Sequence, residues 1–92
     1  MGYIVDFSQR AKEDFISYKK AGNKIALAKI DEIIEELKVH PETGIGKPKK
    51  LKNDPEKRWS RRIDQKNRMT YQINGNSITV FVVAAKGHYD DK

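Results

Sequence analysis

The chain has 92 residues, 19 Lys or Arg against 13 Asp or Glu, a formal net charge of +6 and no cysteine. Its length predicts a single domain over residues 1–92, with room for one sheet and a helical layer. Disulfides and thiolate metal sites are excluded, and two histidines are too few for a histidine-rich metal site. No apolar stretch could cross a bilayer, and the N-terminus lacks the basic start of a signal peptide. We therefore expect a cytoplasmic protein with no membrane partner, metal or cofactor.

The first half of the chain predicts a short strand and two helices. Residues 3–7 alternate apolar and polar side chains, which is typical of a strand, and Ser8 can cap a helix that ends at Gly22. Asn23 can cap a second helix, which Pro41 stops. The apolar positions of the two helices are Ala11, Phe15 and Tyr18, then Ala26, Ile30, Ile33, Ile34 and Leu37. The acids interpreted as the solvated face of the second helix are Asp31, Glu32, Glu35 and Glu36.

After a loop rich in glycine and proline, the remaining sequence predicts three strands, over residues 57–64, 68–73 and 77–86. Asn74-Gly75 is the strongest short hairpin signal in the chain. The predicted fold class is therefore α+β. A short N-terminal strand and two helices precede a three-stranded antiparallel meander, which forms one sheet packed on the helices.

The apolar pattern predicts the register of the first hairpin. If residues 65–67 form a three-residue loop, Ile63 faces Met69, Arg61 faces Tyr71 and Trp59 faces Ile73. These side chains then lie on the face turned toward the helices, where we expect Trp59 in the core and Arg61 on a helix carboxylate. The side chains expected on the open face are Arg62, Asp64, Arg68 and Thr70.

The net charge is concentrated between Ile45 and Arg68, where ten Lys or Arg stand against three acids. The rest of the chain has nine bases and ten acids, so this stretch supplies the whole positive excess. A field this localised predicts a surface for a polyanion, and phosphate is the obvious candidate.

Basic groups, a histidine and aromatic side chains suit RNA cleavage without a metal. In that reaction the 2′-OH attacks the adjacent phosphorus, so a base, an acid and cations on the phosphate are needed. His88 can transfer protons near neutral pH, and Arg62 and Arg68 can each clamp phosphate oxygens. Tyr89 can stack on a base or bind phosphate. The lysines that add charge from the loop are Lys47, Lys49, Lys50 and Lys52. Residue types alone also allow an exposed His88 and a lysine loop that binds nothing specific.

Several spaced segments together resemble one family. They are Gly46-Lys47-Pro48, Leu51-Lys52, Trp59-Ser60-Arg61-Arg62-Ile63, Asn67-Arg68-Met69-Thr70-Tyr71 and His88-Tyr89. The combination is similar to the YoeB-like (Txe/YoeB) branch of the RelE/ParE toxin superfamily, and the similarity extends over nearly the whole chain. The resemblance implies a toxin of a type II toxin–antitoxin system that cuts mRNA in the A site of the 30S ribosomal subunit without a metal. It also implies a YefM-like antitoxin that inhibits the toxin, and a homodimer of the free toxin.

The resemblance also assigns roles by position. Arg68 corresponds to the arginine that stabilises the transition-state phosphate, His88 to the general acid and Tyr89 to the tyrosine that shapes the site. Lys52 and Arg62 correspond to basic residues that hold RNA.

Two features depart from the family pattern. Residues 90–92 extend the chain beyond the tyrosine at which the family usually ends, and we interpret them as solvated. Lys49 occupies the position of the glutamate that acts as general base. A lysine can act as a base only when neutral, and an ordinary lysine has a pKa of about 10.4. Three interpretations of Lys49 stay open: a base, a purely electrostatic group, or a change that attenuates the toxin. The alternative function is accordingly a non-catalytic toxin that acts by binding, as a ParE-like gyrase inhibitor or an RNA-binding module.

Overall fold

Two helices and a five-stranded mixed sheet make up the part of the chain that the computed structural model describes, residues 2–77 and 79–87. In chain order the elements are β1 (Ile4–Phe7), α1 (Gln9–Lys20), α2 (Lys24–Leu37), β2 (Lys49–Lys50), β3 (Trp59–Arg62), β4 (Arg68–Asn74) and β5 (Thr79–Ala84). The strand order is β1-β5-β4-β3-β2, with β1 parallel to β5 and every other neighbouring pair antiparallel. The predicted α+β class is confirmed.

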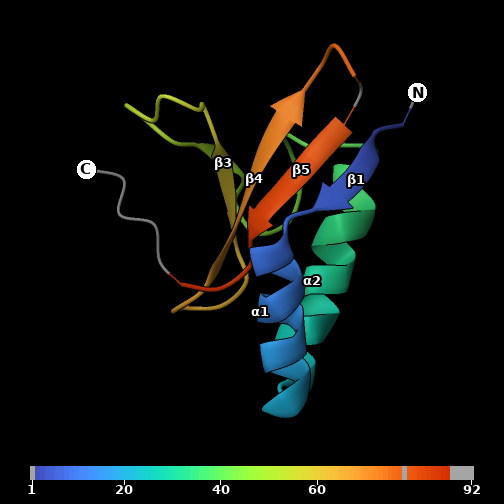
Figure 1. Cartoon of the computed structure of the whole chain (residues 1–92), viewed down its shortest axis with the longest axis vertical. Helices are drawn as coiled ribbons and strands as arrows, with labels where there is room; N and C mark the ends of the chain where they lie inside the picture. Colours follow the sequence, from blue (N-terminus) through green and yellow to red (C-terminus); the bar gives the residue numbers. More distant parts are fainter. Residues whose placement is uncertain (1, 78, 88–92) are drawn as a thin grey trace.

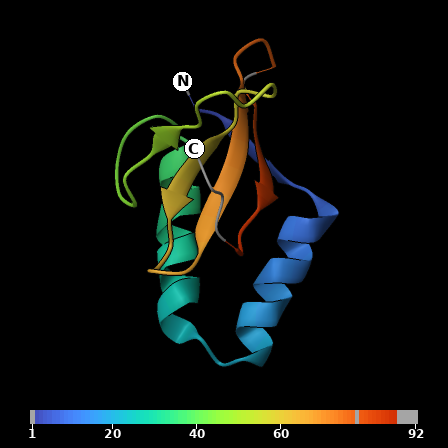
Figure 2. The ribbon, with the colours of Figure 1, turned by 90° about the vertical axis from the view of Figure 1, so that its left-hand side faces the viewer.

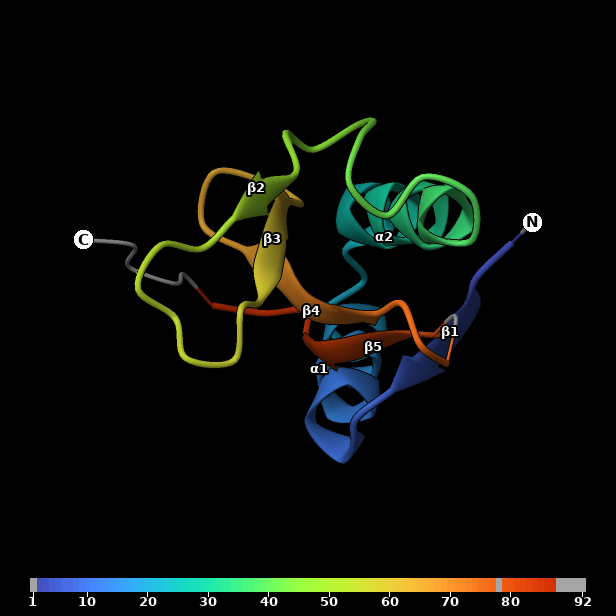
Figure 3. The same ribbon diagram turned by 90° about the horizontal axis from the view of Figure 1, so that it is seen from above.

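The two helices form a hairpin that supports the sheet. In Figure 1, α2 lies behind the sheet and α1 continues downward from the end of β1; Figure 2 shows the helices joined at their lower ends. The β1 edge and the β2–β3 edge stand at opposite ends of the twisted sheet in Figure 3. Within the described residues, neither helix is both long and apolar enough to cross a membrane.

The core lies between the helices and the inner face of the sheet. Its buried members are Ala11, Tyr18, Ala26, Ile30, Ile33, Leu37, Ile63, Met69, Tyr71, Val80, Val82 and Ala85. Burying a large apolar side chain contributes about 1.5–3 kcal/mol, so this cluster supplies most of the driving force for folding. Trp59 packs against it from β3, as predicted, and is half-buried.

Both predicted helix caps are present. Ser8 Oγ accepts a hydrogen bond from the Ala11 amide at 3.0 Å, and Asn23 Oδ1 accepts one from the Ala26 amide at 3.1 Å. Each cap satisfies an amide that has no partner within its helix. The second helix ends at Leu37, four residues before the proline that was expected to stop it.

Two details of the predicted sheet are wrong. Lys49 and Lys50 were expected in a loop but form the additional strand β2, which pairs with β3. The β3–β4 register differs by two residues from the predicted one, because Arg61 lies opposite Met69 and Trp59 lies opposite Tyr71. The strands are joined through residues 63–67, a longer connection than the three-residue loop assumed. Since side chains alternate with a period of two, this shift leaves the side chains that lie within the strands on their predicted faces. Asp64 was expected on the open face of the strand but lies in the connection after β3.

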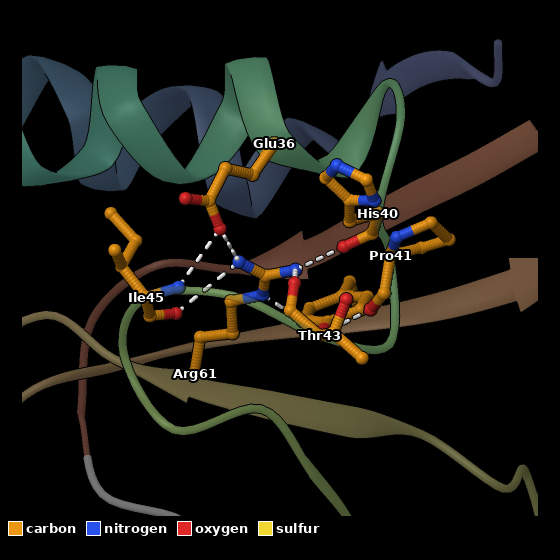
Figure 4. A network of polar contacts seen from close by, with 7 residues as sticks. Glu36, His40, Pro41, Thr43, Ile45 and Arg61 are labelled. Carbon is orange, nitrogen blue, oxygen red and sulfur yellow. Dashed lines mark hydrogen bonds and ion pairs between the residues drawn. The ribbon is translucent and has the colours of Figure 1, made fainter.

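Arg61 lies on the inner face with no exposed surface and clamps the loop after α2 (Figure 4). Its Nη1 atom donates to Glu36 Oε1 at 2.7 Å and to the Ile45 carbonyl at 3.2 Å. Its Nη2 atom donates to the carbonyls of His40 and of Thr43, the latter at 2.8 Å. The expectation that Arg61 would reach a helix carboxylate is confirmed. The interpretation of Glu36 as part of a solvated face is wrong, because this carboxylate holds the arginine.

Further hydrogen bonds close this network. Arg61 Nε donates to the Tyr71 hydroxyl at 3.2 Å, and that hydroxyl donates to the Pro41 carbonyl at 2.8 Å. Burial opposes ionisation of Glu36, but hydrogen bonds from Arg61 and from the Ile45 amide outweigh it, so the pKa of Glu36 lies below its usual value. The Arg61 guanidinium group therefore has a hydrogen-bond acceptor for each of its nitrogen atoms, at the junction of helix, loop and sheet.

A buried carboxylate, that of Asp54, holds the turn before β3. Asp54 has no exposed side-chain surface, and its oxygens accept from Arg58 Nε at 2.8 Å, Arg58 Nη2 at 3.1 Å and the Arg58 amide at 3.0 Å. The hydrogen bonds from Arg58 lower the pKa of Asp54 to about 2. Asp54 therefore fixes both the path of the turn and the orientation of the Arg58 side chain.

We expect Arg61→Met to lower the free energy of unfolding by about 3 kcal/mol or more, because it leaves Glu36 and several loop carbonyls without their buried donor. Urea unfolding followed by circular dichroism measures the change. Arg62→Met is the matched control, since Arg62 is the exposed neighbour on the same strand and should change stability by less than about 0.5 kcal/mol. Equal midpoints for the two variants would contradict the clamp.

We expect Asp54→Asn to flatten the acid side of the stability profile. The folded-state pKa of Asp54 lies below the ordinary value, so the unfolded chain binds the proton first as the pH falls. The stabilisation by this carboxylate is therefore complete above about pH 5 and is lost between about pH 4 and pH 2. Urea titrations of both proteins from pH 6 to pH 2 measure this difference. Parallel profiles for wild type and variant would show that Asp54 contributes no such linkage.

Candidate functional site

Two arginines face each other on the open side of the sheet. Arg62, in β3, pairs directly with Arg68, in β4, and the neighbouring pair on this face is Ser60 with Thr70. Like charges directly opposite one another on adjacent strands destabilise a sheet. An anion that binds both guanidinium groups would remove this repulsion, so the pair has the arrangement of a phosphate clamp. The predicted sharing of one face by Arg62, Arg68 and Thr70 is confirmed.

The edge strand β2 adds Lys49 to the same face. Lys49 pairs with Ser60, and paired residues of adjacent antiparallel strands project to the same side. Lys50 pairs with Trp59 and so projects to the other side. Lys49 is therefore brought beside the arginine pair, whereas Lys50 is not.

The loop that carries the other lysines is attached to β3 at the arginine pair. The Arg62 amide donates to the Gly46 carbonyl at 2.6 Å. Gly46 has a φ of +78°, and a β-carbon there would lie 2.8 Å from the Arg62 carbonyl oxygen, so only glycine fits. Lys47 and Lys52 are exposed in the segments on either side of β2. Lys47 directly follows Gly46, so the chain carries it next to Arg62.

The chain reaches the arginine pair a second time near its C-terminus. The Arg68 amide donates to the Gly87 carbonyl at 3.0 Å, and the Gly87 amide donates to Asn67 Oδ1 at 3.0 Å. Gly87 is the residue before His88. His88 and Tyr89 lie outside the described residues, and their assignment as site residues stays a prediction.

Asp64 builds the turn between the two arginine-bearing strands. Burial opposes its ionisation, but hydrogen bonds from the Asn67 side chain and from the amides of Lys66 and Asn67 outweigh this and lower the pKa of Asp64. A carboxylate held in this way is a weak base, and its oxygens are committed to the turn. Asp64 therefore shapes the site and is poorly suited to act as the general base in place of the family's glutamate, whose position Lys49 occupies.

The structure adds three cations that were not nominated from the sequence. Arg10, Arg58 and Lys86 line a hollow of about 290 Å³ together with Thr70, Val83 and Ala84. Arg58 entered the sequence argument only as one charge of the basic stretch. Arg10 and Lys86 lie far from that stretch in sequence, so only tertiary structure could have brought them to this face.

The comparisons with known proteins agree with this architecture. A family model for the YoeB-like toxin of bacterial type II toxin–antitoxin systems matches residues 7–89. The chain is 36% identical to Toxin YoeB of Mycobacterium bovis over 85 residues, which cover 92% of this chain and 96% of the relative. It is 31% identical to Toxin YoeB of Streptomyces coelicolor, with 92% and 98% covered.

Solved structures give the same result. The YoeB/ParE toxin from Agrobacterium tumefaciens superposes with a TM-score of 0.84 at 28% identity, covering 94% of this chain and 99% of that one. A YoeB dimer from Staphylococcus aureus gives 0.81 at 31% identity, and a heterotetrameric YoeB–YefM complex from the same organism gives 0.78 at 30% identity; each covers 95% of this chain and 98% of the other. An archaeal RelE from a RelE–RelB complex, at 18% identity and a TM-score of 0.74, shares the fold. From the family match and these relatives we conclude that the chain belongs to the YoeB-like toxins of bacterial type II toxin–antitoxin systems.

Proposed function

We propose that this toxin is a metal-independent endoribonuclease that cuts mRNA in the ribosomal A site and is inhibited by a YefM-like antitoxin. The observation that supports this most directly is the pairing of Arg62 with Arg68 on the open face of a YoeB-like fold. Two guanidinium groups on adjacent strands can hold the oxygens of one phosphate, which is the group that must be stabilised during RNA cleavage.

The proposed reaction is an intramolecular transesterification. The 2′-oxygen of the message attacks the adjacent phosphorus, the bond to the 5′-oxygen breaks, and a 2′,3′-cyclic phosphate and a 5′-hydroxyl result. Arg68 and Arg62 stabilise the charge that builds on the non-bridging oxygens. His88 protonates the leaving 5′-oxygen, and Tyr89 shapes the site around it.

The lysines have distinct proposed parts. Lys49 lies on the same face as the arginine pair, so we assign it an electrostatic role at the phosphate. Lys47 and Lys52 attract the RNA backbone from the segments flanking β2, and Lys50 contributes to the general positive field. The proton acceptor for the 2′-hydroxyl is then a group of the ribosome, because His88 must carry its own proton to act as the acid.

The partners follow from the relatives. A YoeB–YefM heterotetramer and a YoeB dimer are known for the Staphylococcus aureus proteins. We propose that this chain forms a corresponding complex with its own antitoxin, which covers the basic face, and that the free toxin dimerises. Opposite charge across the interface would favour rapid association.

Purified protein should cleave mRNA on programmed ribosomes in the presence of a chelator. Arg68→Ala should slow the cut by about 10²–10³-fold, as expected for loss of one group that stabilises the transition state. His88→Gln should slow it by about 10²–10⁴-fold through loss of proton transfer. Lys24→Ala, an exposed change at the start of α2, is the control and should leave the rate unchanged. Full activity of Arg68→Ala would contradict the assigned clamp.

Lys49→Glu tests the departure from the family pattern. If Lys49 acts electrostatically in a working enzyme, the wild-type chain cuts the message. The variant also cuts it, because the glutamate supplies a base in place of the positive charge that is lost. Primer extension on the same ribosomes measures both rates. A silent wild type with an active Lys49→Glu variant would show instead that the lysine attenuates a competent scaffold. Silence of both would favour a toxin that acts by binding alone.

A further inference from the structure

The hollow beside the arginine pair has the chemistry of a nucleotide-binding pocket. Its floor includes Val83 and Ala84 from β5, and Thr70 from β4 supplies a hydroxyl group. Thr70 lies two residues beyond Arg68 on the same face of β4, so the hollow continues the face that carries the phosphate clamp. A volume of about 290 Å³ can hold one nucleobase with part of its ribose.

Arg58 lines the hollow, and the orientation of its guanidinium group is fixed. Arg58 is bound through Nε and Nη2 to the buried carboxylate of Asp54, and its side chain retains 24% exposure. Two parallel hydrogen bonds to one carboxylate hold the guanidinium plane rigidly. What such a group offers a ligand is its flat surface, and RNA bases stack on arginine planes. An arginine held before the ligand arrives also loses little conformational entropy on binding.

The rim of the hollow carries two more cations, each placed by a contact with α1. Arg10, in the first turn of α1, lies 3.9 Å from Asp14. Lys86 Nζ donates to Ser17 Oγ at 2.6 Å. Both residues line the hollow, so three cationic side chains share it with the apolar side chains of Val83 and Ala84. Proteins that bind single-stranded RNA combine the same two features: a flat side chain on which a base stacks, and positive charge beside the phosphate.

We propose that this hollow binds one nucleotide of the message next to the cleaved bond, with its base stacked on Arg58 and its phosphate near Arg10 and Lys86. The inference rests on the proposed nuclease function and adds a subsite to it. The RNA chain would then be held at two points, with the scissile phosphate at the arginine pair and the neighbouring nucleotide at Arg58. Holding the chain at two points aligns the 2′-oxygen with the phosphorus, which is a positioning role for Arg58.

Messages with a single abasic nucleotide test the stacking contact. Cleavage is measured on ribosomes with an intact message and with the abasic position moved through the A-site codon and its neighbours. For wild type, one position should slow the cut by about tenfold, which is within the range for loss of one stacked base. Arg58→Lys keeps the charge near Asp54 but lacks the plane, so it should be about tenfold slower on the intact message and insensitive to the abasic nucleotide.

The double comparison separates stacking from a structural effect. A variant that merely distorts the fold slows every message by the same factor and retains the abasic penalty, whereas a lost contact removes the penalty at one position only. Lys57→Gln is the matched control, since it removes a charge adjacent in sequence that does not line the hollow. It should keep both the rate and the penalty. Urea midpoints of the variants confirm that each is folded.

The outcomes distinguish this subsite from the underlying function. If wild type cuts the message but Arg58→Lys shows the same abasic penalty as wild type at every position, the subsite is overturned and the nuclease function stands. A wild-type chain that cuts no message would overturn the proposed function itself, and the subsite with it. An abasic penalty at one position that wild type and Lys57→Gln show and Arg58→Lys lacks would establish the contact.

Discussion

The buried guanidinium group of Arg61 is the interaction on which the site depends. It joins α2, through Glu36, to the loop of residues 40–45 and to the Tyr71 hydroxyl in the sheet. A buried charge is tolerated only when its donors are satisfied, so the loop carbonyls must converge on this one point. Because side chains alternate along a strand, anchoring Arg61 inward places Ser60 and Arg62 on the open face. The position of Arg62 opposite Arg68 is thus a consequence of the structural arginine next to it.

The open face is built at a cost in stability. Arg62 and Arg68 stand opposite each other, and β2 adds Lys49 to the same side. Uncompensated positive charge destabilises the free protein but strengthens the binding of any polyanion. An antitoxin that presents carboxylates to this face and a message that presents phosphates would relieve the same repulsion. We therefore expect the antitoxin and the message to compete for the same positively charged face.

The sequence patterns predicted those features that depend on residues close together in the chain. Apolar periodicity and the caps at Ser8 and Asn23 located both helices, and alternation placed Arg61 inside and Arg62 outside despite a register error of two residues. The strand β2 was missed because two lysines carry no periodic signal. The register depended on how Asp64 folds its turn, which apolar matching cannot detect. The hollow at Arg58 draws its walls from residues 10 to 87, so no sequence window contains it.

In the proposed reaction, Lys49 would act through a different balance of forces from the glutamate that the family carries at this position. A glutamate at this position would accept a proton but repel the phosphate, whereas a lysine beside the arginine pair attracts it. Attraction accelerates the reaction only to the extent that it is stronger in the transition state. The phosphate gains a second negative charge as the 2′-oxygen attacks, so each cation on this face interacts more strongly with the transition state than with the message. The lysine can thereby offset part of the rate that the missing base would have supplied, which is typically about 10²–10⁴-fold.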